Sequence, residues 1–165
     1  DNCEEYEESG LTFRFPAGQV FKPDAVDTKG LQHVKGCDFV WRKAAKKVWI
    51  VEVKSSAPKS GDALQGDMKR IAGQFLHGVF LWLAAIGGRH TDRISLPGAL
   101  SKIDAMQAKP QFILVVSALP RDAAQPLQDA LQREIGAECR AFDMPPPLVL
   151  SGDRILRHFP VEMAS

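Results

Sequence analysis

Two neighbouring segments rich in β-branched and aromatic residues constrain this chain more than any other feature of its sequence. The first is residues 36–41 (GCDFVW), the second is residues 48–56 (VWIVEVKSS), and a basic stretch, residues 42–47, separates them. Val, Ile, Phe and Trp favour strands, and two such segments joined by a short polar connection predict an antiparallel hairpin.

Three charged side chains of this hairpin, Asp38, Glu52 and Lys54, lie outside its basic turn. Glu52 and Lys54 share one face, because successive side chains of a strand point to opposite faces. Pairing across the basic turn can bring Asp38 close to Glu52. Two carboxylates beside an apolar sheet are unfavourable unless something compensates them, and Mg²⁺, a hard cation that binds oxygen ligands, is able to do so. The alternative is a half-buried salt bridge between Lys54 and Glu52 or Asp38.

The spacing of these residues resembles a known signature. Asp38, thirteen intervening residues and then Glu52-Val53-Lys54 are similar to the motif of the PD-(D/E)XK nuclease superfamily, although Cys37 stands where the superfamily's name has proline. The expected element order over residues 4–118, helix-strand-strand-strand-helix-strand, agrees with it. The resemblance implies an α/β fold of the restriction-endonuclease-like type, a mixed central β-sheet flanked by helices.

The same resemblance implies a function. The chain would be a Mg²⁺-dependent nuclease, with Mn²⁺ able to substitute, that hydrolyses phosphodiester bonds of DNA in preference to RNA. Asp38 and Glu52 would hold the metal together with the Val53 carbonyl, and Lys54 would assist the attacking water. The products would carry 5′-phosphate and 3′-hydroxyl ends.

The resemblance also implies accessory residues at the site, but the spacing of the sequence does not single out one residue for each role. An acidic residue of the first helix often joins the metal site, and Glu8 or Glu4 can take that role. RecB-like members carry Gln and, four residues later, Tyr; here Gln74 is followed by Gly78, so the pattern is incomplete. Further candidates to contact the site are Gln65 and Lys69. Each of these is otherwise an ordinary surface residue.

Contacts to nucleic acid are expected from local basic residues, because the net charge of +1 provides no global signal. The candidates are Arg42 and Lys43 in the hairpin and Lys59 in the loop after it. Two copies often act together in such folds, so a homodimer or a larger complex remains open. A second function class is also open: a catalytically inactive module of the nuclease fold that binds nucleic acid or a protein partner.

Periodicity predicts the remaining elements. The longest helix covers residues 63–85, because apolar residues recur there at helical spacing. An almost wholly apolar run, residues 111–116, predicts a buried strand parallel to residues 48–55. The other expected segments are a helix end at 1–9, strands at 11–15 and 32–42, a short helix at 98–107, a helix at 126–135, an interrupted strand at 141–150 and an edge segment at 155–161.

Length and composition set broad limits. A chain of 165 residues with ordinary apolar and charged fractions predicts one domain, residues 1–165. The three cysteines form no closely spaced pair, which argues against a zinc site or a disulfide framework and favours a reducing cytoplasm. No apolar run is long enough to span a membrane. The chain does not begin with Met, so it can be part of a longer protein.

Overall fold

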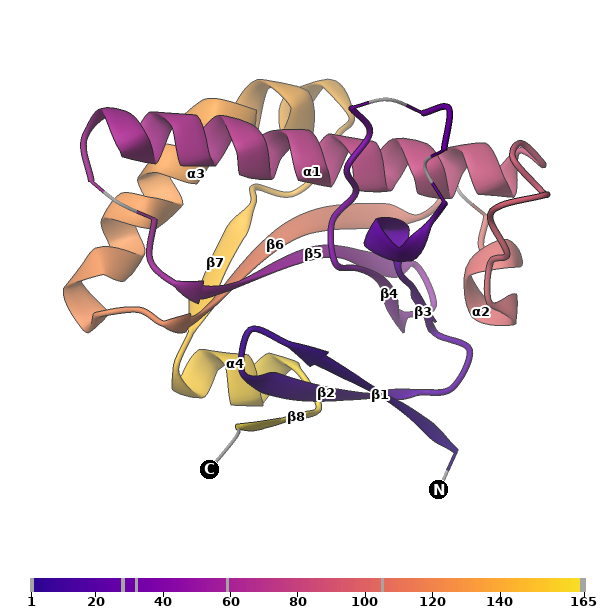
Figure 1. Cartoon of the computed structure of the whole chain (residues 1–165), viewed down its shortest axis with the longest axis horizontal. Helices are drawn as coiled ribbons and strands as arrows, with labels where there is room; N and C mark the ends of the chain where they lie inside the picture. The colour runs from indigo at the N-terminus through magenta and orange to yellow at the C-terminus, as the bar shows by residue number, and fades with distance from the viewer. Residues whose placement is uncertain (1, 28, 32, 59, 105, 164–165) are drawn as a thin grey trace.

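The architecture consists of a mixed β-sheet between two covering layers (Figure 1). The computed structural model describes residues 2–27, 29–31, 33–58, 60–104 and 106–163. The large sheet has the order β3-β4-β5-β6-β7 and contains β3 (Val20–Phe21), β4 (Phe39–Ala44), β5 (Lys47–Ser56), β6 (Lys109–Ala118) and β7 (Leu148–Ser151). The α/β fold with a mixed central sheet is therefore confirmed.

A smaller antiparallel sheet covers one face of the large sheet. It has the order β1-β2-β8 and contains β1 (Cys3–Glu8), β2 (Leu11–Pro16) and β8 (Val161–Met163). The short helix α4 (Asp153–His158) lies beside it (Figure 1). The opposite face carries the two long helices, α1 (Asp62–Ile86) and α3 (Ala124–Ala141), and a four-residue helix, α2 (Gly98–Ser101), lies near the end of α1.

The centre of the large sheet is the predicted hairpin. β4 and β5 pair antiparallel, with Phe39 opposite Val51 and Trp41 opposite Trp49. β5 then leads through α1 to β6, which pairs with β5 in parallel, as the apolar run at 111–116 predicted. A parallel pair needs such a crossover, and α1 provides it while covering the sheet.

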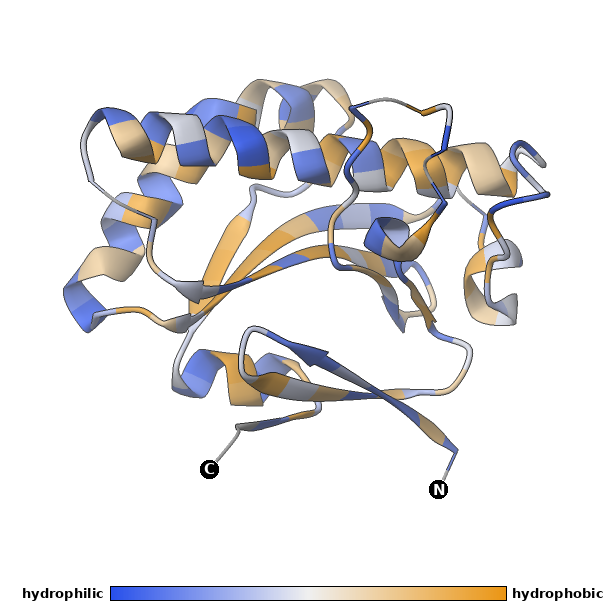
Figure 2. Cartoon of the chain, viewed as in Figure 1, coloured by the Kyte–Doolittle hydropathy of each residue, from blue (hydrophilic) through white to orange (hydrophobic). Residues whose placement is uncertain are grey.

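Side-chain alternation along β5 divides the core into two parts. The strands β5, β6 and β7 are largely orange in Figure 2, because apolar residues dominate them. Val48 and Ile50 point toward α1, whereas Trp49, Val51 and Val53 point toward the small sheet. The alternation puts Glu52 on the helix face, where the strand would otherwise continue the apolar core. A charged residue thus stands in a row of buried ones.

Helix α1 matches its predicted range closely. Its buried side chains include Met68, Ile71, Phe75, Val79 and Trp82, which are spaced three or four residues apart and form one stripe facing the sheet. Helix α3 begins two residues earlier and ends six residues later than the predicted 126–135. Within the described residues, each helix is too short or too polar to span a bilayer.

The N-terminal prediction was wrong. Residues 1–9 were expected to end a helix, but Cys3–Glu8 form β1, which pairs with β2. The side chains alternate between exposed and half-buried, and Glu5 faces Arg14 across the pair in a salt bridge of 2.8 Å. Cross-strand pairing of opposite charges stabilises an acidic strand, and only the partner strand reveals it.

Other boundaries also differ from expectation. The strand predicted at 32–42 is β4, which begins at Phe39 because residues 33–38 form no ladder. Residue 32 lies outside the described residues. The short helix predicted at 98–107 ends at Ser101. The segment 141–150 is a strand only from Leu148 onward, after three consecutive prolines, which cannot donate ladder hydrogen bonds. The segment 155–161 is mostly helix α4, since Ile155 and Phe159 both enter the core from one side.

Candidate functional site

The candidate site lies where β5 ends and β4 begins. Asp38 directly precedes β4, and the register that pairs Phe39 with Val51 places Asp38 next to Glu52. The Asp38 carboxylate fixes this geometry, because its Oδ2 accepts a hydrogen bond of 2.7 Å from the Val53 backbone N–H. The hairpin therefore brings the two carboxylates together, as the sequence predicted.

Glu52 is the most deeply buried charged residue of this group, with only 1% of its side chain exposed. Its Oε1 accepts a hydrogen bond from Lys54 Nζ, and the buried side chain of Gln74 on α1 lies near enough to lower the pKa of the carboxyl group. Its Oε2 is buried and has no hydrogen-bond partner among the described residues. A buried carboxylate oxygen without a partner is costly, so this atom points to a missing ligand.

Two further carboxylates converge on the same place. Glu8 ends β1, Asp24 lies in the 3-10 helix η1 (Pro23–Ala25), and both approach Asp38. One carboxylate oxygen from each of these residues lies within 4.8 Å of the others. Asp38 thus lies beside two groups of acids: Glu52 from β5, and Glu8 with Asp24 from β1 and η1.

The crowding of negative charge changes the acidity of Asp38. Burial, the neighbouring Glu52 and, to a smaller extent, Glu8 and Asp24 together raise its pKa from the ordinary value of 3.8 to about 7. The Val53 N–H acts in the opposite direction because it hydrogen-bonds to the ionised form. Near neutral pH, Asp38 is therefore poised between its two protonation states.

The pKa values of Glu52 and Asp24 are also raised. Burial raises the pKa of Glu52, while Lys54, Gln74 and Lys35 partly offset this effect. Desolvation also raises the pKa of Asp24, where Lys22 lowers the pKa and Glu8 raises it. Three carboxyl groups with raised pKa values in one cluster indicate a site that favours a bound cation.

Three lysines surround the carboxylates. Lys54 lies at the rim beside Glu52, and Lys22 forms a salt bridge of 3.1 Å with Glu8. Lys35 is exposed, and the backbone N–H of its residue donates to His77 Nδ1 on α1 at 3.1 Å. His77 therefore contacts the loop before β4 and not the carboxylates themselves.

The Val53 carbonyl, predicted as a metal ligand, faces this edge. The Val53 N–H points to Asp38, and the N–H and C=O of any one strand residue point to the same side of the strand. The carbonyl also accepts a hydrogen bond of 3.4 Å from Ser9 Oγ, which ties the tip of the β1–β2 hairpin to the end of β5. Of the predicted accessory residues, Glu8 and Gln74 are part of the cluster.

Other predicted residues lie elsewhere. Lys69 is exposed on α1, and a separation of five residues turns it about 140° around the helix from Gln74. Gln65 lies in a hollow between α1 and α3. Glu4 is engaged in structural contacts, since it accepts hydrogen bonds from Tyr6 and from the Gly18 backbone N–H. Lys59 lies outside the described residues.

The two hairpin cations predicted to contact nucleic acid lie at the other end of β4. Arg42 donates to the Ala99 carbonyl at 3.0 Å, and Lys43 Nζ donates to the His158 carbonyl. Lys43 Nζ also lies 4.0 Å from the centre of the Trp49 ring. Neither side chain is beside the carboxylates.

Sequence reasoning missed Asp24 and Lys22. Both belong to the connection between β3 and β4, where an irregular backbone carries no periodic signal. Only the folded path of this connection brings them to Glu8 and Asp38. Cys37 is poorly suited to act as a nucleophile, because burial and the nearby carboxylates raise the pKa of its thiol well above the ordinary value.

The fold and the site define an α/β protein with an acidic cluster and a lysine at the end of its central hairpin. Comparison of the chain with known protein families, with curated proteins and with solved structures finds no match.

Proposed function

We propose that this chain is a divalent-metal-dependent nuclease that hydrolyses DNA phosphodiester bonds. The observation that carries the proposal is the convergence of Asp38, Glu52 and Lys54 at one edge, with Glu8 and Asp24 added from two other elements. This arrangement, with the helix-connected parallel pair β5–β6, supports the resemblance to the PD-(D/E)XK superfamily. The element order departs from that superfamily at its start, where β1 replaces the expected helix.

The residues present fit a hard divalent cation. Carboxylate and carbonyl oxygens are the ligands that Mg²⁺ and Mn²⁺ prefer, and the unpartnered Oε2 of buried Glu52 leaves a ligand position unsatisfied in the described part of the chain. Asp38, Glu52 and the Val53 carbonyl would hold the metal, and Glu8 and Asp24, whose carboxylates lie close to Asp38, would add negative charge to the site. When bound, the cation would lower the pKa of a water and stabilise charge on the phosphate.

Lys54 is the side chain of the protein that can act directly on the phosphate or on the attacking water. Its ammonium is anchored by Glu52 yet 27% of its side chain is exposed, so it can donate to a phosphate oxygen or orient a water. A hollow of about 350 Å³ begins at Lys54 and is also lined by Arg70 and Ser56. This hollow provides room for the sugar-phosphate chain next to the scissile bond.

The test is a cleavage assay on supercoiled and linear DNA, with single-stranded DNA and RNA alongside. Each substrate is incubated with Mg²⁺, Mn²⁺ or EDTA. We expect metal-dependent cutting that Glu52→Gln and Lys54→Met each abolish. Matched controls are Asp122→Asn and Lys29→Met, which change exposed residues away from the cluster. Cleavage retained by both site variants would exclude the mechanism.

One observation favours the second function class, a nuclease-fold module that binds without cutting. Phe80 on α1 is 55% exposed beside an apolar hollow lined by Leu31, Val34 and Leu81. A binding module has no need to hold a divalent cation, so titration with Mn²⁺ separates the two classes. Three free cysteines, two of them buried, support a reducing cytoplasm as the place of action. A homodimer or larger complex remains compatible with both.

A further inference from the structure

A second charged surface lies at the opposite end of the central sheet from the carboxylates. We call it the basic end. It combines the turn between β4 and β5, the start of β6 and the helix α4. Its cationic residues are Lys43, Lys46, Lys47, Lys109, Arg154 and Arg157.

Contacts in the structure hold these elements together. The Lys109 backbone N–H donates to the Lys46 carbonyl at 2.6 Å, which joins β6 to the hairpin turn. Lys43 Nζ donates to the His158 carbonyl, which joins the hairpin to α4. The His158 ring lies 5.7 Å from the Trp49 ring, centre to centre. The six cations therefore gather around one fixed surface.

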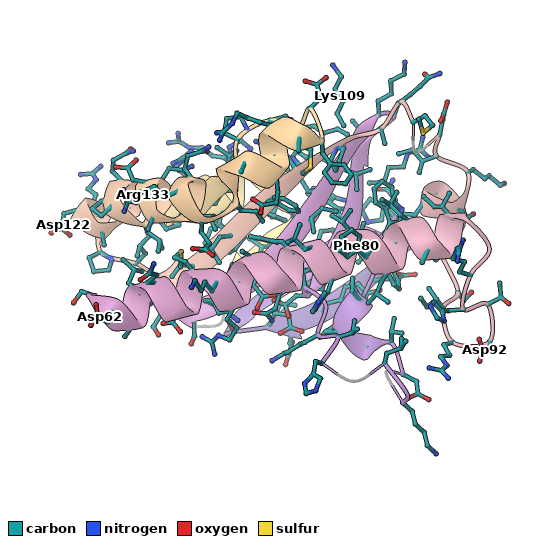
Figure 3. The ribbon with its side chains drawn as sticks, turned by 90° about the horizontal axis from the view of Figure 1, so that it is seen from above. Asp62, Phe80, Asp92, Lys109, Asp122 and Arg133 are labelled. Carbon is teal, nitrogen blue, oxygen red and sulfur yellow. The ribbon has the colours of Figure 1, made fainter. Side chains whose placement is uncertain are left out.

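This surface is separate from the candidate metal site. Lys47 and Glu52 lie on the same strand, five residues apart, which corresponds to about 16 Å. Figure 3 shows Lys109 set apart from the ribbon of α1, the helix whose Gln74 lies beside Glu52. One phosphate group cannot contact both places, so a partner that touches both must be an extended molecule.

The positive charge of the basic end is not compensated within the protein. Lys47 and Lys109 are direct partners in the parallel ladder, and like charges at such positions repel. Among the described residues, none of the six cations forms an ion pair with a carboxylate. Burial lowers the pKa of His158, and Lys43, Arg154, Lys47 and Arg157 lower it further. Such a surface is suited to a bound polyanion.

A hollow at the basic end indicates which kind of polyanion fits this surface. It has a volume of about 690 Å³, three lysines line it, and its other lining residues are Ala44, Ala45, Gln111 and Pro145. A nucleic-acid strand combines phosphates, which the lysines attract, with flat bases, which pack on apolar surface. A peptide made of Asp and Glu alone has no such flat faces.

We propose that the basic end binds the sugar-phosphate backbone of nucleic acid, several nucleotides away from the carboxylates. The choice of nucleic acid over other polyanions rests in part on the proposed function. The position and charge of the surface do not depend on it.

The test is fluorescence anisotropy of a labelled DNA 20-mer, single-stranded or duplex, at several salt concentrations. It uses the full chain carrying Glu52→Gln, in EDTA, so that neither cleavage nor metal binding affects the result. The basic-end variant adds Lys46→Gln, Lys47→Gln and Lys109→Gln. The matched control adds Lys29→Gln, Arg121→Gln and Arg133→Gln, which remove the same charge from other surfaces. Thermal unfolding of both variants verifies that they fold.

We expect the basic-end variant to bind at least tenfold more weakly at low salt. The slope of log affinity against log salt should fall by about 2 to 3, since each lost phosphate contact removes about 0.7 to 0.9. The control should keep the slope of its parent. An unchanged slope in the basic-end variant, or an equal loss in the control, would overturn the inference. So would binding of polyglutamate or of anionic lipid vesicles by a parent chain that does not bind DNA.

Failure of this inference and failure of the nuclease proposal give different results. A chain that binds DNA through the basic end but cuts no substrate supports the inference and contradicts the nuclease. A chain that cuts DNA with Mg²⁺ while the triple substitution leaves binding unchanged does the reverse.

Discussion

Asp38 is the side chain of the site whose ionised form is disfavoured by burial and by several neighbouring carboxylates. Its carboxylate must accept the Val53 N–H to close the hairpin edge, yet Glu52 and two further acids surround it. The hydrogen bond favours the ionised form and the neighbours oppose it. A residue kept in such a conflict serves a purpose other than stability of the metal-free chain.

The first prediction concerns the pH dependence of stability. Because the pKa of Asp38 is raised from 3.8 to about 7, the folded chain binds more protons than the unfolded chain between these values. Stability without metal should therefore be highest at acidic pH within this window and should fall as the pH rises toward 7. Asp38→Asn, whose side-chain oxygen can still accept the Val53 N–H, should remove part of this fall and raise stability at pH 8, by about 1 to 3 kcal/mol.

Urea unfolding of both proteins between pH 5 and 8, in EDTA, measures this effect. Asp122→Asn is the control, since it makes the same chemical change at an exposed position. A lower stability of Asp38→Asn at pH 8 would contradict the prediction and would assign Asp38 a structural role.

The second prediction concerns the ion pair between Lys54 and Glu52. Lys54→Met leaves the buried Glu52 carboxylate without its hydrogen-bonded cation, and an isolated buried charge is unfavourable. We expect a loss of about 1 to 3 kcal/mol at pH 8. The double variant Glu52→Gln/Lys54→Met should recover most of this loss, because no unpaired charge remains. Additive effects of the two single changes in a double-mutant cycle would show that the pair is not coupled.

At the scale of elements, the contact between α1 and the loop before β4 positions the site. Cys37 is fully buried, and its Sγ occupies the space that a Cβ at Gly78 would need, at 2.4 Å. Close approach at Gly78 lets Cys37 lie directly on the helix, and Asp38 follows in the chain. The glycine at position 78 therefore has a packing reason.

The third prediction uses two glycines of α1. Gly78→Ala should destabilise the chain by about 1 to 3 kcal/mol, because the new methyl group collides with Cys37 and the site loop must move. Gly73→Ala should stabilise it by about 0.5 to 1 kcal/mol, since no atom lies within 4 Å of its added Cβ and alanine favours the helix. Thermal unfolding of both variants measures the contrast. Equal effects would mean that helix propensity, and not packing, decides both.

The same elements show what the sequence could predict. The hairpin, α1 and β6 have strong apolar periodicity, and the spacing from Asp38 to Glu52 follows from the hairpin, so this half of the site was predictable. β1 was not, because its acidic residues are stabilised by partners on β2 that periodicity does not reveal. Asp24 was not, because the irregular connection that delivers it has no repeating pattern.

At the scale of the whole molecule, the net charge of +1 conceals a separation of charge. Carboxylates gather where β5 ends, and cations gather where β5 begins. The two groups are too far apart to neutralise each other through direct pairing. Under the two proposals, each end of the sheet binds a partner of opposite charge from outside the chain: a cation at one end and a polyanion at the other.

The last prediction concerns that cation. Mn²⁺ or Mg²⁺ should raise the Tm, because the folded chain assembles the carboxylates while the unfolded chain scatters them. At a concentration about ten times Kd, binding adds roughly 1.4 kcal/mol, which for a chain of this size raises the Tm by about 3 to 6 °C. Asp38→Asn should abolish the rise, since this residue links both groups of acids, and Asp24→Asn should weaken it. KCl at equal ionic strength separates binding from screening, and a Tm unaffected by either divalent cation would exclude the metal site.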